Sequence, residues 1–177
     1  MKYLKYSIII LIVASLVYVV SPSKTFEQQG LRGSTNTDSV KVIFESLGKV
    51  GKESGKVIYD VPPYDFNMFV IANNDSVSAI RILELSGRGC GEDLPFQIEP
   101  GETKKTFKNG YGYRGMSVVR HFDTNTSCLE TISINFSFEL LDSNGKRHDT
   151  TSGNLELKPY QKTPSKIGFW WTAAMGI

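Results

Sequence analysis

The chain has few of the residues that build disulfide frameworks and metal centres. Its 177 residues include only two cysteines and two histidines. That number excludes a disulfide-dense miniprotein and disfavours a structural zinc site, so we expect no metal and no cofactor. Apolar residues make up 40% and charged residues 21%, a globular composition that argues against long disorder, collagen and coiled coil.

The chain also has no large excess of charge of one sign. The chain contains 20 Lys and Arg and 18 Asp and Glu. Two of the basic residues, Lys2 and Lys5, lie in the first 23 residues. Without residues 1–23, 18 basic residues remain against 18 acidic ones. The body of the protein therefore has no overall attraction to phosphate backbones, and we expect no nucleic-acid partner.

One long uncharged run opens the chain. No charged residue occurs in the 18 positions from Tyr6 to Ser23, and Lys2 and Lys5 precede the run. Basic residues before an apolar run remain on the cytoplasmic side, which predicts export of the rest of the chain. We expect residues 1–23 to be a signal-anchor that contacts the membrane through residues 6–20.

The alternative is a cleaved signal peptide. The best cleavage site follows Ser23, with Ser21 two residues earlier, and cleavage there would release a secreted or periplasmic protein. A cut directly after Ser21 would place Pro22 next to the scissile bond. The weak cleavage chemistry and the adequate length favour the anchor, with the C-terminal domain outside the cytoplasm (periplasmic in a Gram-negative cell).

If the chain is exported, its two cysteines are in an oxidising compartment that favours a disulfide. Cys90 and Cys128 are 38 positions apart, and paired thiols oxidise in extracytoplasmic compartments. The sequence therefore predicts a Cys90–Cys128 disulfide, with two free buried thiols as the alternative.

Residues 24–56 are mostly polar and predict a stalk. Within this range, residues 39–47 have apolar side chains at helical spacing, which favours a short helix. A short strand is the alternative, because Val40, Val42 and Phe44 alternate.

Residues 57–160 show the period-two pattern of an antiparallel domain. The segment from Leu129 to Leu141 alternates most regularly, and Asp142 to Lys146 then predicts a hairpin turn. The turn around Pro100-Gly101 is similar to those common in immunoglobulin-like sandwiches. Seven or eight such segments with no helical alternation predict a mainly β, antiparallel immunoglobulin-like β-sandwich.

The catalytic patterns that we sought are missing or incomplete. His121 lies two residues before Asp123 inside a predicted strand, but the chain has no Gly-x-Ser-x-Gly nucleophile motif. Residues 87–91 form a Gly-rich segment without the Lys-Ser/Thr ending of a phosphate loop. Glu92 and Asp93 are adjacent carboxylates, which point apart on a strand and do not suit paired acid–base work. We therefore expect no catalytic residues and no enzymatic activity.

Two segments have the composition of contact surfaces. A Gly-rich loop near residues 104–114 mixes basic and aromatic side chains, among them Tyr111, Tyr113 and Arg114. The hydrophobic tail of residues 161–177 is uncharged from Ile167 onward and contains Phe169, Trp170, Trp171 and Met175. Aromatic side chains are common anchors of protein interfaces, so we expect these residues to bind a partner. The alternatives are a solvated hairpin tip for the loop and a segment folded back on its own core for the tail.

Together these features predict a non-enzymatic binding or structural subunit of a cell-envelope assembly. It would be membrane-anchored and would contact protein partners through sheet edges, loops or the aromatic tail. The alternative is a periplasmic inhibitor or immunity protein that binds an exported enzyme or toxin. An enzyme is a third and weaker hypothesis. The sequence leaves the partner and the oligomeric state open.

Overall fold

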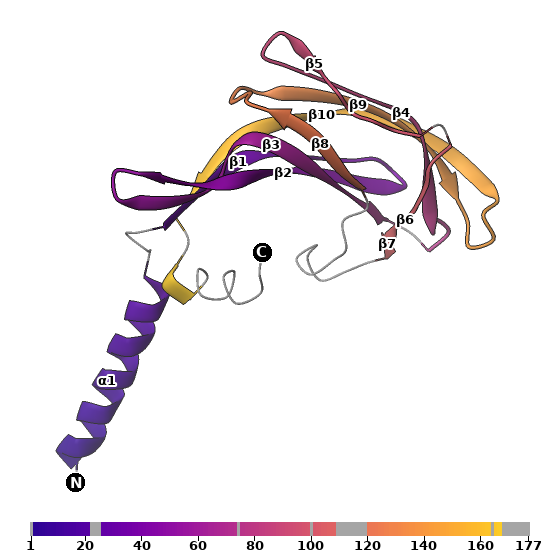
Figure 1. The fold of residues 1–177 in the computed structure, drawn as a ribbon. Coiled ribbons are helices and arrows are strands. Elements are labelled where there is room, and N and C mark those ends of the chain that lie inside the picture. Colours follow the sequence, from indigo (N-terminus) through magenta and orange to yellow (C-terminus); the bar gives the residue numbers. More distant parts are fainter. Residues whose placement is uncertain are drawn as a thin grey trace. The chain divides into compact units, whose positions relative to one another are not determined.

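The protein is built almost entirely from strands. The computed structural model describes residues 2–21, 26–73, 75–99, 101–108, 120–163 and 165–167 (Figure 1). In these residues one helix, α1 (Lys2–Val20), precedes ten strands. The strands are β1 (Phe26–Asn36), β2 (Val40–Glu53), β3 (Lys56–Ala72), β4 (Ala79–Gly89), β5 (Glu92–Leu94), β6 (Thr103–Lys105), β7 (Phe107–Lys108), β8 (Arg120–Thr126), β9 (Ile132–Leu141) and β10 (Arg147–Lys162). The predicted mainly β fold is thus confirmed.

The ten strands form one continuous sheet. Its order is β5-β4-β9-β10-β1-β2-β3-β7, while β6 pairs with β4 and β8 pairs with β3. The pairs β4–β9, β9–β10, β1–β2 and β3–β8 are antiparallel. A two-sheet immunoglobulin-like sandwich is not confirmed by this order.

The chain divides into two compact units. The smaller unit comprises Met1–Gln29, Val50–Tyr59 and Gln161–Ile177, and the larger comprises Gly30–Lys49 and Asp60–Tyr160. In the smaller unit, β1 runs parallel to β3 over three residue pairs, and Glu27 accepts hydrogen bonds from Lys56 and Gln161. The larger unit contains the hydrophobic core.

That core is a single cluster lined by alternating side chains. On β9, Ile132, Ile134, Phe136 and Phe138 are all buried, as the alternation in the sequence predicts. They join buried residues of β2, β3 and β8 in the same cluster. The phenyl ring of Phe96, which follows β5, lies 5.0 Å from the ring of Phe122 on β8. Because β5 and β8 belong to opposite ends of the strand order, this contact joins the two ends of the sheet across the core.

The prediction of a stalk over residues 24–56 and a helix at 39–47 is wrong. Residues 26–36 and 40–53 form β1 and β2, which pair from Arg32 with Glu45 to Asn36 with Lys41. The apolar residues of this segment suggested a helix because the first half of β2 is buried on both faces and is therefore apolar on both. Val42, Ile43 and Phe44 are each at most 1% exposed. The competing alternation was the correct signal.

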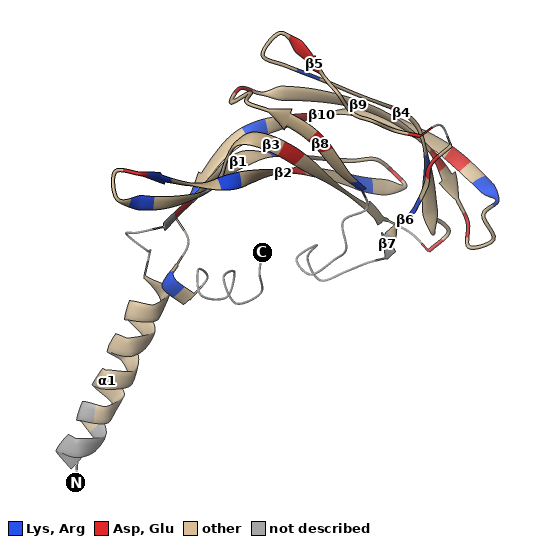
Figure 2. Cartoon of the chain, viewed as in Figure 1, with Lys and Arg blue, Asp and Glu red and all other residues tan. Residues whose placement is uncertain are grey.

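Helix α1 carries apolar side chains on every face. All described side chains from Ile8 to Tyr18 are exposed, and Figure 2 shows no charged residue among the described side chains of α1. Over the described residues, no helix reaches the combination of length and hydropathy that a membrane crossing requires.

Candidate functional site

Four polar side chains gather on the outer face of the β3–β8 pair. On β8, Phe122 points into the core, so His121 and Asp123 on either side of it point outward. On β3, Phe66 is buried in the same way, which places Asp65 and Asn67 on the outer face. Asn67 lies directly opposite His121 in the register.

A bulge brings Asp65 toward the two residues of β8. The register passes from Tyr64 paired with Thr126 to Phe66 paired with Phe122, so one residue of β3 faces three of β8. Asn125 adopts a positive φ of 46° in this bulge, and its backbone N–H donates to Asp65 Oδ1 at 2.9 Å. Inside the core, the Thr124 hydroxyl donates to the carbonyl oxygen of Tyr64 at 2.9 Å. These two hydrogen bonds fix the position of Asp65.

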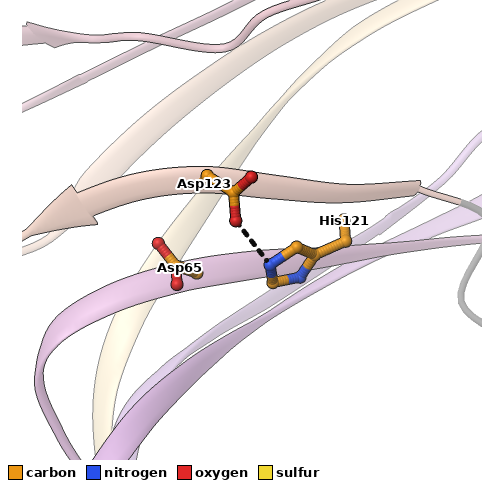
Figure 3. Close-up of side chains that lie close together, drawn as sticks. All are labelled: Asp65, His121 and Asp123. Carbon is orange, nitrogen blue, oxygen red and sulfur yellow. Dashed lines mark hydrogen bonds and ion pairs between the residues drawn. The ribbon is translucent and has the colours of Figure 1, made fainter.

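The imidazole of His121 is held from both nitrogens. Its Nδ1 lies 2.8 Å from Asn67 Oδ1, and its Nε2 lies 3.0 Å from Asp123 Oδ1 (Figure 3). An amide oxygen only accepts, so Nδ1 is the donor to Asn67. A hydrogen bond to Asp123 needs a proton on Nε2 as well; when Nε2 carries no proton, its lone pair faces Asp123 Oδ1. One ligand atom from each of Asp65, His121 and Asp123 lies within 4.8 Å of the others, which makes these three residues potential metal ligands.

Two members of this group, His121 and Asp123, were considered from the sequence and set aside as non-catalytic. His121 and Asp123 stood out because they are two residues apart, and His121 does lie in a strand. Asp65 and Asn67 were missed. Both residues alternate along the strand with the buried Tyr64, Phe66 and Met68, which places them on the outer face. The sequence does not show that this strand pairs with β8, and only the register brings them next to His121.

A second polar group lies beside β6. Glu102 accepts a hydrogen bond from Lys104 Nζ at 2.8 Å, and Arg120 Nε lies 3.6 Å from the same carboxylate oxygen. Burial raises the pKa of the Glu102 carboxyl, but the Lys104 hydrogen bond, the Arg120 and Lys104 charges and the Glu99 backbone N–H outweigh it. The pKa of Glu102 therefore lies below its ordinary value. This arrangement stabilises an ionised carboxylate and links β8 to the segment before β6.

The predicted disulfide is confirmed. Cys90 and Cys128 are bonded, with their Cα atoms 5.7 Å apart. Much of the Gly-rich segment 87–91 is strand rather than loop, because Gly87 and Gly89 lie in β4. Cys90 and Gly91, with φ values of 52° and 81°, form the turn into β5. A side chain at Gly89 would lie 2.6 Å from Ile132 and 3.2 Å from Cys128 Sγ, so glycine gives the space that the disulfide needs.

The other expected contact residues lie outside the described residues. This holds for Tyr111, Tyr113 and Arg114 in the loop, and for Phe169, Trp170, Trp171 and Met175 in the tail. The start of the tail is described. Lys166 Nζ lies 3.3 Å from the ring centroid of Tyr18, and its backbone N–H donates to the carbonyl of Ser21 at 3.1 Å. Residue 166 therefore contacts the C-terminal end of α1.

Comparison of the chain with models of known protein families, with curated proteins and with solved structures gave no match.

Proposed function

We propose that the protein is an exported, membrane-anchored binding subunit of a cell-envelope assembly that performs no chemistry on its partner. The observation that carries this proposal is helix α1, whose side chains from Ile8 to Tyr18 are all exposed and, except for Ser15, all apolar. A helix of 19 residues is about 29 Å long, close to the roughly 30 Å thickness of a bilayer hydrocarbon core. A soluble helix would instead present one polar face to water.

The disulfide supports the location outside the cytoplasm. Structural disulfides persist in oxidising compartments, and Cys90–Cys128 lies C-terminal to the apolar helix. Lys2 and Lys5 lie in the first four residues of that helix, before its uncharged run, which matches the charge bias of an N-terminus retained in the cytoplasm. Together these features favour a β-domain on the outer side.

The aromatic tail suits the same location. Lys166 packs on Tyr18 at the end of α1, where the membrane interface would begin. Tryptophan and tyrosine prefer this interface, and they also anchor protein contacts. We propose that residues 167–177 form the partner contact next to the membrane. The β-domain would serve as an immunoglobulin-like binding module, because strands from both ends of the sheet order enclose one core.

The experiment is a topology test on the full chain, produced in a Gram-negative host. We expect membrane flotation, resistance to alkaline carbonate, an intact mass that begins at Met1, and cleavage of the β-domain by protease added outside spheroplasts. Replacing Ile9 and Val13 in α1 with lysine should abolish flotation, because each buried lysine costs about 3 kcal/mol at the centre of a span. The matched control replaces the exposed Leu47 and Val50 of β2 with lysine and should still float.

Two outcomes would contradict the anchor. A soluble monomer whose mass begins near Lys24 would leave the alternative, a free periplasmic inhibitor or immunity protein. A β-domain protected from external protease would exclude export. Partner binding is tested by gentle detergent extraction, in which stoichiometric partners should be lost when residues 167–177 are deleted.

A further inference from the structure

We propose that Asp65, His121 and Asp123 form a binding site for one divalent transition-metal ion of the zinc class. The proposal concerns the outer face of the β3–β8 pair and does not depend on the proposed envelope function. Figure 3 shows the three side chains, two from β8 and one from β3, gathered at one place. The bound ion would link the two strands across the bulge.

The donor atoms are close enough for one ion to reach all of them. The three ligand atoms lie within 4.8 Å of one another. In a tetrahedral zinc site with bonds of about 2.0 Å, neighbouring ligand atoms are about 3.3 Å apart. The 3.0 Å between His121 Nε2 and Asp123 Oδ1 is already near this value. Asp65 supplies the third ligand atom, within 4.8 Å of the other two.

The ring of His121 is oriented as in known metal sites. Metal-binding histidines usually donate their second N–H to a carbonyl or carboxylate, which fixes the tautomer and the ring plane. Asn67 Oδ1 accepts that bond from Nδ1 at 2.8 Å. When Nε2 carries no proton, its lone pair faces Asp123, and a bound cation would take the place of the proton between the two atoms. The Asn125 N–H donates to Asp65 Oδ1.

The site is open to solvent. The side chains of His121 and Asp123 are 40% and 90% exposed, so an ion can enter without any strand moving. Three protein ligands leave a fourth position for water or for a donor from another molecule. The imidazole nitrogen favours zinc and its neighbours, while magnesium and calcium prefer oxygen ligands alone.

The test measures zinc binding to the full-length chain in detergent, purified with a tag that contains no histidine. The chain is dialysed against buffered free zinc, and bound zinc is measured by elemental analysis. We expect one zinc per chain for the wild type and at least a tenfold loss of affinity in H121A and D123N. Asp123 is almost fully exposed, so D123N replaces the charged carboxylate ligand with a neutral amide without disturbing packing. Asn67→Ala retains all three ligands and should lose about tenfold, the usual effect of removing an orienting partner.

The matched control is H148A, which removes the other histidine of the chain. His148 lies near Ser76 on an exposed surface, with Nε2 3.3 Å from the hydroxyl oxygen. H148A should bind zinc like the wild type, and magnesium at the same concentration should not compete. The proposal is overturned if the wild type binds no zinc, or if D123N and H148A bind it equally well. Variants are compared only where circular dichroism shows the wild-type fold.

Discussion

At the scale of single residues, a few polar side chains gain their properties from the strand opposite them. Glu102 is the clearest case, because its carboxylate is 11% exposed yet is held ionised by Lys104 and Arg120. His121 is another, since Asn67 and Asp123 fix both ring nitrogens. Each of the two has one partner that is distant in the sequence, Arg120 for Glu102 and Asn67 for His121, so the residue's own position in the sequence says little about its state.

Glu102 predicts a pH dependence of stability. Its pKa is lower in the folded state than in the unfolded state, so ionised Glu102 stabilises the fold at pH values above its unfolded pKa, about 4.5. This contribution is lost as the pH falls through the lower, folded-state pKa. We expect Glu102→Gln to lower the free energy of unfolding by about 1 kcal/mol at pH 7, and the difference from wild type to shrink as the pH falls below about 4.5.

Urea unfolding at a series of pH values measures this difference. Glu84→Gln, at an exposed position of β4, is the control and should show no comparable difference. A Glu102→Gln difference that stays constant or grows on acidification would contradict the assignment.

At the scale of elements, the sequence predicted strands well where one face is buried. The alternation of Ile132, Ile134, Phe136 and Phe138 correctly gave β9, because side chains on opposite faces of this strand meet different surroundings. The same rule failed for β1, whose mixture of glutamine, glycine, serine and threonine resembles a linker. The glycines of β1 allow neighbouring segments to pack closely against this strand. Amino-acid composition alone does not distinguish such glycines from those of a flexible linker.

The candidate site shows the same limit. Period two placed His121 and Asp123 on one face, but only the pairing of β3 with β8 adds Asp65 and Asn67. The β3–β8 pairing joins segments that are more than fifty residues apart in the sequence. It also contains a bulge that no local sequence pattern predicts. Sequence reasoning therefore considered His121 and Asp123 on one strand without assigning them a role, and it missed Asp65 and Asn67 on the partner strand.

Gly33 tests whether β1 is a packed strand or a stalk. A Cβ at this position would overlap the carbonyl oxygen of Glu156 on β10 and lie 2.8 Å from the carbonyl carbon. Backbone atoms cannot move aside as a side chain can, so we expect Gly33→Ala to cost about 1–3 kcal/mol, a fall in Tm of about 3–10 °C. Thermal unfolding followed by circular dichroism measures it. Ser34→Ala is the neighbouring exposed control, and equal Tm values for the two variants would show that β1 does not pack in this way.

At the scale of the whole molecule, the sheet depends on contacts that join elements far apart in its strand order. β8 pairs with β3, whereas β9, the next strand in the chain, pairs with β4 and β10. The connection between β8 and β9 therefore crosses from one part of the strand order to another. Cys128 lies in this connection and is bonded to Cys90 at the end of β4. The disulfide thus fixes the crossing point, while Phe96 and Phe122 join the two ends of the sheet.

This position predicts a large effect of reduction on global stability. A disulfide that closes a loop of 38 residues stabilises the fold by about 4 kcal/mol in the chain-entropy model. Replacing both Cys90 and Cys128 with serine should therefore lower the urea midpoint substantially, with the sheet still formed because its core is unchanged. Reducing the wild type with dithiothreitol should lower the midpoint similarly, whereas the double variant should not respond to the reductant. The disulfide holds the connection between β8 and β9. Equal urea midpoints for the oxidised and the reduced wild type would therefore mean that the hydrophobic core alone fixes the path of this connection.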